Sequence, residues 1–278
     1  MAKWARKLQV SESGYYSWRE KKPHREEKEA QEKSVIKSIF EEDDGYGPER
    51  ICGIIRERGG SMGREKCARH MADMDLSSVH NRRRQRCLTN SKKDRGDGYI
   101  NLLRLEMPII PRYALSSDIT YLRTGEGFEY LCIIKDIFTG EILGRHIAAR
   151  MTKELVINAF LSMTARYEFP EGCIFHSDRG SQYTSKAFKD LLLTYGFRQS
   201  FSRVGMPGDN AWSESFFANM KKELVHWQHY DTRDQIRTAV FEYIEVRYNG
   251  NRAQKRLGYI SPRKFFERLQ IEEFLKVA

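Results

Sequence analysis

Long apolar runs are missing from this sequence of 278 residues. The longest, such as Leu131–Ile134, fall far short of the roughly 20 residues that a helix needs to cross a bilayer. The first seven residues have no apolar core and do not resemble a signal peptide. We therefore expect a cytoplasmic protein with no membrane partner.

Closely spaced metal-binding or disulfide-forming pairs are also missing. The five cysteines lie far apart, their number is odd, and no Cys-x-x-Cys pair occurs. This argues against a disulfide framework or a zinc site. Cys132 and Cys173 fall in apolar, strand-like runs, where we expect reduced, buried thiols. His226 and His229 are three residues apart without further ligands at matching spacing, which is too little to indicate zinc.

Acidic residues are too few to balance the basic ones. The chain has 48 lysines and arginines against 38 aspartates and glutamates, a formal net charge of +10. A basic chain favours a polyanionic partner, nucleic acid first.

The first part of the chain, residues 1–98, is expected to be a helical, basic DNA-binding region, followed by a linker at 99–111. Apolar residues at helical spacing are interrupted by the glycine-rich turn 59–63 and then resume in a basic segment. A helix, a tight turn and a basic helix are typical of a helix-turn-helix DNA reader. The alternative is a small helical bundle with a solvated face. The expected DNA contacts in the second helix are Arg64, Lys66 and Arg69.

Residues 81–98 are rich in arginine and lysine and have no hydrophobic period. A run of charge is usually just solvated; the alternative is an arm that follows DNA phosphates. The candidate residues of this arm are Arg82, Arg83, Arg84 and Arg86.

From about residue 112 the hydrophobic pattern changes from helical to alternating, which predicts strands. The predicted order is three strands, then helix, strand, helix, strand and helix. This order indicates an α/β fold with a mixed five-stranded sheet flanked by helices. We place this core at 112–228 and expect a helical tail at 229–278.

Three carboxylates stand at places where such a sheet would bring them together. Asp118 is on the polar face of the first strand, Asp178 ends the fourth, and Glu214 opens a helix. Carboxylates held close together repel one another unless cations neutralise them, and hard oxygen ligands suit Mg²⁺ or Mn²⁺. Two such ions can activate the attacking oxygen and stabilise the leaving oxygen at a phosphodiester. Asp136 competes for this role, but a structural role is favoured for it.

Four longer motifs resemble one family. The segments 118–121 (DITY), 176–183 (HSDRGSQY), 209–217 (DNAWSESFF) and 257–262 (LGYISP) look like those of bacterial insertion-sequence transposases. The most similar group makes its transposase from two overlapping frames. Thirty-five residues (179–213) separate Asp178 from Glu214, which is the D,D,35,E spacing of that family. The resemblance implies a catalytic core of the retroviral-integrase, ribonuclease-H-like superfamily.

The resemblance also assigns roles to residues. It implies that Asp118, Asp178 and Glu214 hold the catalytic ions, and that Lys221, seven residues after the glutamate, contacts DNA. Two helical turns, about 10.5 Å, would put Lys221 on the face of Glu214. His176, Arg179 and Gln182 surround the second aspartate, where they either orient the substrate or shape the turn. The helix that carries Glu214 is expected to be capped by Asp209 or Asn210. The tail departs from the family at 248–255, and Arg252 is expected to contact DNA or a partner chain.

The expected function is transposition: nicking of the element's ends, then attack of the 3′-hydroxyl on another DNA strand. The expected partners are the terminal inverted repeats, target DNA and further copies of the chain. Because residues 8–18 and 46–51 resemble the start of a downstream-frame product, an upstream-frame protein or fusion is also expected. Two alternatives stay open: a ribonuclease-H-like nuclease that cuts without joining, and a non-catalytic DNA-binding regulator.

Overall fold

The computed structural model describes residues 11–78, 99–104, 109–203, 206–225 and 228–277. The chain forms two compact units, 1–82 and 83–278. The predicted arm of Arg82, Arg83, Arg84 and Arg86 lies outside the described residues.

The described part of the first unit consists of helices joined by turns and short loops. Its core is made by apolar residues of the last three helices, including Ile36, Ile39, Ile51 and Met71. The turn between the last two helices contains Gly59, whose φ of 83° lies in the left-handed region. The helices are α2 (Glu12–Glu20), α3 (Lys22–Glu42), α4 (Pro48–Glu57) and α5 (Arg64–Asp73).

The second unit is built on one mixed five-stranded sheet with the strand order β3-β2-β1-β4-β5. β2 pairs antiparallel with both β1 and β3, whereas β4 pairs parallel with both β1 and β5. The strands are β1 (Ala114–Thr124), β2 (Gly127–Asp136), β3 (Ile142–Ala148), β4 (Ile174–Ser177) and β5 (Arg198–Phe201). The predicted α/β architecture, a mixed five-stranded sheet flanked by helices, is confirmed.

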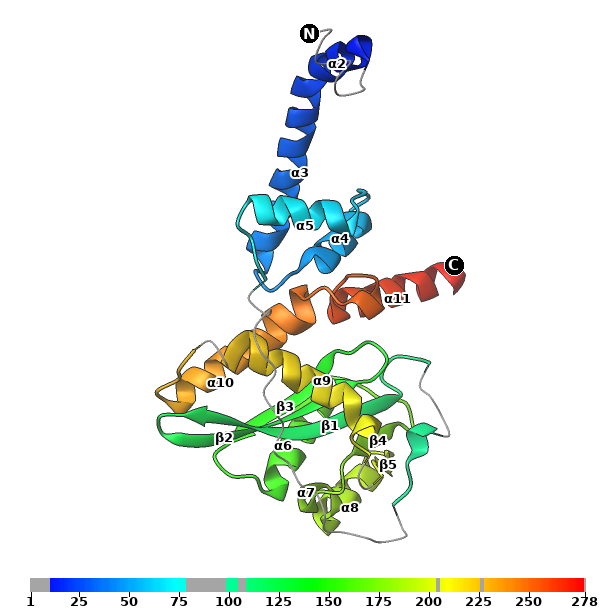
Figure 1. Cartoon of the computed structure of the whole chain (residues 1–278). Helices are drawn as coiled ribbons and strands as arrows, with labels where there is room; N and C mark the ends of the chain where they lie inside the picture. Colours follow the sequence, from blue (N-terminus) through cyan, green and yellow to red (C-terminus); the bar gives the residue numbers. More distant parts are fainter. Residues whose placement is uncertain (1–10, 79–98, 105–108, 204–205, 226–227, 278) are drawn as a thin grey trace. The chain divides into compact units, whose positions relative to one another are not determined.

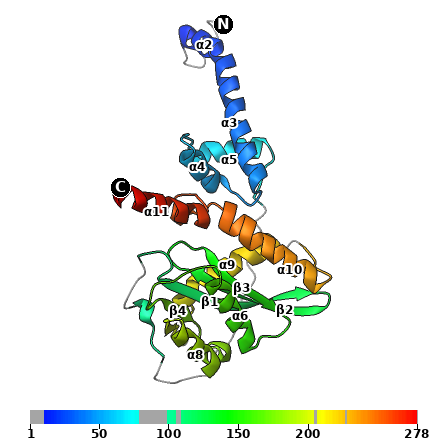
Figure 2. The same cartoon turned by 180° about the vertical axis from the view of Figure 1, so that it is seen from behind.

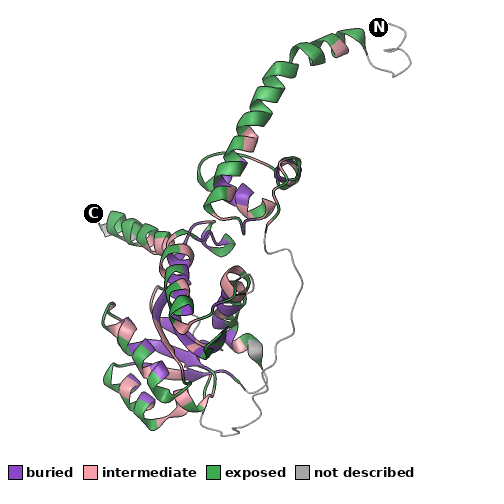
Figure 3. Ribbon diagram, turned by 90° about the vertical axis from the view of Figure 1, so that its left-hand side faces the viewer, coloured by how far each residue is buried: buried purple, intermediate pink, exposed green. Residues whose placement is uncertain are grey.

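Helices cover both faces of this sheet (Figure 1). One face packs against α6 (Lys153–Thr164), α7 (Ser181–Thr184) and α8 (Lys186–Thr194). The opposite face packs against α9 (Ala211–Met220) and α10 (Arg233–Glu242). The view from behind shows α6 and α8 on their side of the strands (Figure 2). Burial is concentrated in the strands and in the inward sides of the helices (Figure 3).

Two of the helices on the second face continue as π-helical turns. η3 (Lys221–Val225) prolongs α9, and η4 (Tyr243–Asn251) prolongs α10. The last helix is α11 (Pro262–Val277). The short 3₁₀ segments are η1 (Leu102–Arg104), η2 (Pro207–Asn210) and η5 (Lys255–Leu257).

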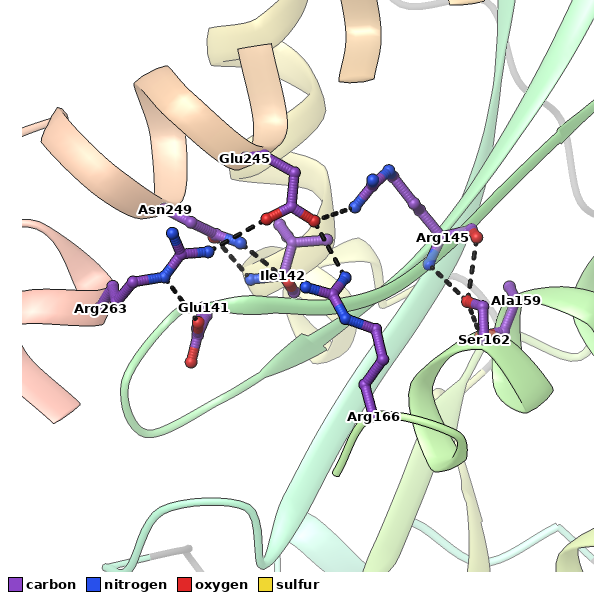
Figure 4. Close-up of polar contacts among 9 residues, drawn as sticks. All are labelled: Glu141, Ile142, Arg145, Ala159, Ser162, Arg166, Glu245, Asn249 and Arg263. Carbon is purple, nitrogen blue, oxygen red and sulfur yellow. Dashed lines mark hydrogen bonds and ion pairs between the residues drawn. The ribbon is translucent and has the colours of Figure 1, made fainter. Parts of the chain in front are cut away.

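Polar contacts attach this C-terminal part to the sheet. The side-chain amide of Asn249 donates to the carbonyl of Ile142 and accepts from its N–H, each at 2.9 Å. Glu245 accepts from Arg145 on β3 at 2.5 Å, and from Arg166 and Arg263 at 3.0 Å each (Figure 4). This carboxylate therefore joins β3, the segment after α6 and the start of α11.

The sequence also made predictions about the cysteines and about membrane spans. Cys132 and Cys173 are buried free thiols, as predicted. Within the described residues, no helix has the length and apolar character that a membrane span requires.

Candidate active site

Asp118 and Asp178 come from neighbouring parallel strands. β1 and β4 pair in a register that sets Ser116 beside His176. Asp118 lies two residues after Ser116, and Asp178 lies two residues after His176. Asp178 is the first residue after β4, where its Oδ1 accepts from the N–H of Gly180 at 2.9 Å. Parallel pairing thus brings the two aspartates to the same end of the sheet, as the sequence predicted.

Glu214 comes from the first turn of α9, which is fastened to β1 just before Asp118. The buried hydroxyl of Ser116 bonds to the side-chain oxygen of Asn210 at 3.0 Å and to the hydroxyl of Ser213. The amide of Asn210 also donates to the carbonyl of Ser117 at 3.4 Å. Because Glu214 follows Ser213, these bonds fix the glutamate on the side of the sheet where Asp118 lies.

A buried lysine on β2 fastens the same helical turn from the second strand. Lys135 is 4% exposed, and its Nζ donates to the carbonyl of Trp212 at 2.8 Å. Burial lowers the pKa of this lysine. The start of α9 is therefore tied to both β1 and β2.

The three carboxylates interact electrostatically. Asp118 is half-buried, and this burial, together with the nearby charges of Asp178 and Glu214, raises its pKa to about 7. The bond from the N–H of Ile119 and the charge of Lys221 act in the opposite direction. Loss of hydration also raises the pKa values of Asp178 and Glu214.

The triad does not form a closed cluster. Within the described part of the chain, only Glu29, His70 and Asp73 bring three such ligand atoms within 4.8 Å of one another. In that group the ammonium of Lys33 already pairs with Glu29 at 2.6 Å and with Asp73 at 3.0 Å. The three acids of the second unit are wider apart, as expected for like charges that repel one another.

The residues around Asp178 are held by protein contacts. His176 is fully buried between β4 and β5, with Nδ1 2.8 Å from the hydroxyl of Ser200 and Nε2 3.1 Å from that of Ser202. Burial lowers its pKa to about 4, so the ring is neutral at pH 7. Arg179 donates to the carbonyl of Ser202 at 3.1 Å, and Gln182 donates to that of Met151 at 3.2 Å. These contacts favour shaping of the turn.

Lys221 opens the π-helical turn after α9, two turns beyond Glu214. Its Nζ lies 4.8 Å from the centre of the Tyr121 ring, and its charge lowers the pKa of Asp118. The ammonium is therefore near the carboxylates, where the sequence placed it.

Arg252 is in a different setting from the one expected of a DNA contact. It is 5% exposed, and its guanidinium donates to both carboxylate oxygens of Glu223 at 2.7–3.1 Å. This position favours a structural role. In the first unit, Arg64 and Arg69 are exposed on α5, whereas Lys66 pairs with Glu32 at 2.7 Å.

Asp136, Asp209 and Asn210 have structural roles. Asp136 is buried and accepts from the N–H and the hydroxyl of Thr139, so it closes the β2–β3 turn, as its predicted structural role requires. The expectation that Asp209 or Asn210 caps α9 through its side chain is wrong. Asp209 instead accepts from Arg203 and Asn101, and Asn210 bonds to β1.

Sequence reasoning missed the residues that fasten the glutamate helix. Ser116 and Ser213 each stand one or two positions from a candidate acid, and this nearness is the only signal that the sequence offers. Lys135 follows the apolar run of β2, and no pattern marks it.

Comparison with known proteins gives the family. The chain matches the integrase core domain over residues 110–207 and again over 214–269. It is 35% identical over 261 residues to the insertion element IS600 uncharacterized 31 kDa protein of Shigella sonnei, covering 93% of this chain and 96% of that protein. It is 31% identical over 271 residues to the transposase InsF for IS3A of Escherichia coli, covering 94% and 91%.

A third relative, the transposase for IS904 of Lactococcus lactis, is 33% identical over 232 residues, which cover 83% of this chain and 91% of that protein. Among solved structures, the chain aligns with the catalytic core domain of BIV integrase at 15% identity and a TM-score of 0.45. That alignment covers 59% of this chain and 99% of the integrase domain.

The relatives are matched along nearly their whole length. The chain therefore belongs to the IS3-family insertion-sequence transposases, polynucleotidyl transferases of the DDE type with an integrase core domain.

Proposed function

We propose that Asp118, Asp178 and Glu214 bind two Mg²⁺ or Mn²⁺ ions, and that this site nicks the element's ends and joins each 3′-hydroxyl to another DNA strand. The observation that carries the proposal is the coupling of the three acids. Asp118 and Asp178 come from paired strands, Glu214 comes from a helix fastened to the same strand, and both charges act on Asp118.

The residues fit divalent cations. Carboxylate oxygens are the hard ligands that Mg²⁺ and Mn²⁺ prefer. Burial and two like charges make ionised Asp118 unfavourable without a cation, and bound cations would remove this cost. When bound, the ions would supply activation of the attacking oxygen and stabilisation of the leaving oxygen.

Other residues have supporting roles in this proposal. Lys221 binds a DNA phosphate beside the acids, because its ammonium lies near Asp118 and at one end of α9. Neutral His176 holds β4 against β5 and so fixes the position of Asp178. Ser116, Ser213 and Lys135 fix the position of Glu214.

The three parts of the chain divide the work. Residues 1–98 bind DNA through α5 and the basic arm, 112–228 carry out the chemistry, and the helical tail 229–278 braces the core. The DNA partners are the terminal inverted repeats and the target, with several copies of the chain assembled on them. An upstream-frame protein, or a fusion with it, completes recognition of the element's ends. Because the DNA substrate lies in the cytoplasm, the protein acts there.

The test is strand joining with pre-nicked element ends and Mg²⁺. Asp178→Asn and Glu214→Gln should abolish joined products while DNA affinity is retained. Asp231→Asn is the matched control, since this aspartate is also exposed (79%) but lies just before α10 and outside the elements that carry the triad. Full joining activity in either triad variant would refute the assignment.

The same assay separates the alternatives. Cleavage without joined products would indicate a nuclease instead. A regulator would keep its effect on transcription in both triad variants.

A further inference from the structure

The tip of the β1–β2 hairpin has an exposed aromatic pair. Tyr121 is 51% exposed and Phe128 is 48% exposed. Their ring centres are 5.6 Å apart with an interplanar angle of 86°, an edge-to-face arrangement. Large apolar rings in water cost free energy, so such a pair beside a catalytic site suggests a ligand.

The edge of β1 is open where this pair stands. Among the described residues, β4 pairs with β1 only from Ala114 to Ser116. Asp118 and Tyr121 both lie beyond this stretch, on the part of β1 that β4 does not cover. Because side chains alternate along a strand, these two leave β1 on opposite faces, so a ligand reaches both only across this uncovered edge. An extended strand rises about 3.3 Å per residue, so their Cα atoms are roughly 10 Å apart. DNA of B form covers that distance in about three nucleotides.

A cation connects the aromatic pair to the carboxylates. The ammonium of Lys221 lies 4.8 Å from the centre of the Tyr121 ring and also acts on the charge of Asp118. A positive charge for a phosphate, next to an aromatic face for a base, is the combination that binds single-stranded nucleic acid.

We propose that Tyr121, with Phe128 and Lys221, forms a binding site for an unpaired nucleobase of the element's end, within a few nucleotides of the phosphate that is cut. This inference rests on the proposed function of the three acids. Tyr121 stacks on the base, Phe128 packs against the Tyr121 ring, and Lys221 contacts the adjoining phosphate. The site thereby holds the end of the duplex open beside Asp118.

The alternative occupant of this surface is a second copy of the chain. A protein contact would bury the same two rings but would be indifferent to whether the terminal bases are paired. The nucleobase site requires that unpaired ends bind more tightly than paired ends, and that the difference depends on the Tyr121 ring.

The experiment uses the full chain with Glu214→Gln, so that no chemistry takes place, and duplexes that end in the element's own terminal repeat. The terminal bases are either paired or mismatched. Tyr121→Ala should weaken binding of the mismatched end by about tenfold, in the range of one lost stacking contact, and change binding of the paired end much less. Tyr121→Phe should bind as the parent does.

Phe241→Ala is the matched control. Phe241 is 53% exposed and also has a cation over its ring, that of Arg145 at 4.7 Å, but it lies on α10. It should leave both affinities unchanged. Ultraviolet cross-linking of 5-iodouracil at the mismatched positions should attach DNA to the peptide that contains Tyr121.

Equal loss of affinity for paired and mismatched ends, or cross-links that leave out residues 121 and 128, would overturn the proposal. So would a Tyr121→Ala variant whose only defect is fewer copies of the chain on DNA. Because the parent carries Glu214→Gln, these outcomes are independent of whether the three acids catalyse joining.

Discussion

We predict that Arg252 stabilises the fold of the second unit and does not contact DNA. The sequence suggested a DNA or partner contact, whereas the structure buries its guanidinium against Glu223. The side chains are 6% and 2% exposed, respectively. Replacing Arg252 by alanine should therefore destabilise the second unit and leave DNA binding by the folded protein intact.

The magnitude follows from what the replacement leaves behind. Removing one partner of a buried ion pair costs about 3–5 kcal/mol, because the remaining charge stays buried. Glu223 would keep the hydroxyl of Tyr243 at 2.8 Å and the guanidinium of Arg247 at 3.7 Å. We therefore expect the lower end, about 3 kcal/mol, which corresponds to a fall in Tm of about 6–12 °C for a unit of this size.

The pH dependence has a defined sign. Burial alone would raise the pKa of Glu223, but the bonds from Arg252 outweigh it and lower the pKa below its usual value. Without Arg252, burial prevails and the folded-state pKa rises above the unfolded one. The variant then favours the protonated, folded form at low pH, so the loss of stability relative to wild type should shrink as the pH falls toward about 4.5.

The assays are urea unfolding of both proteins and DNA binding over a range of salt concentrations. The double variant Glu223→Gln/Arg252→Met, which leaves no buried charge, should recover most of the lost stability. If Arg252 contacted a phosphate instead, its loss would reduce the slope of log K against log salt by about 0.9. That slope change, with unaltered stability, would refute the structural role.

Two further predictions concern the other polar contacts. Burial alone would raise the pKa of Glu245, but its bonds to Arg145 and Arg166 lower it to about 2. Its stabilising contribution is therefore complete above the unfolded-state value of about 4.5 and is lost as the pH falls toward 2, by up to about 3 kcal/mol. Glu245→Gln should flatten urea-derived stability against pH in this window, and an unchanged slope would contradict the ion-pair account. Ser116→Ala should cost about 1–3 kcal/mol, because Asn210 and Ser213 lose a buried partner. It should also slow strand joining at unchanged DNA affinity, whereas the exposed Ser215→Ala should match wild type in both measurements.

Local patterns were enough to predict the sheet and the place of the three acids. Alternating apolar residues marked β1, and the continuous apolar run marked β2 as a central strand. The alternation of strands and helices after residue 142 predicted parallel strands. Asp118 and Asp178 meet at one sheet end only if the first and fourth strands are neighbours, and β1 does pair with β4.

Other features depend on contacts between distant residues, which local patterns do not encode. Arg252 is 29 residues from its partner Glu223. The two residues meet because Glu223 lies in η3 and Arg252 directly follows η4. Lys135 donates a hydrogen bond to the carbonyl of Trp212, which is 77 residues away in the sequence. The failed prediction of a cap on α9 has the same cause. Asn210 is a good capping residue, but bonds to Ser116 and Ser117 take its side chain.

Anomalous scattering from Mn²⁺, in crystals of the chain bound to its element end, most directly tests whether the three acids work as one metal-binding unit. We predict Mn²⁺ coordinated by Asp118 together with Asp178 or Glu214, and loss of that signal in Asp118→Asn. Manganese bound only elsewhere on the protein, with the three carboxylates contacting no ion while DNA is in place, would contradict the account.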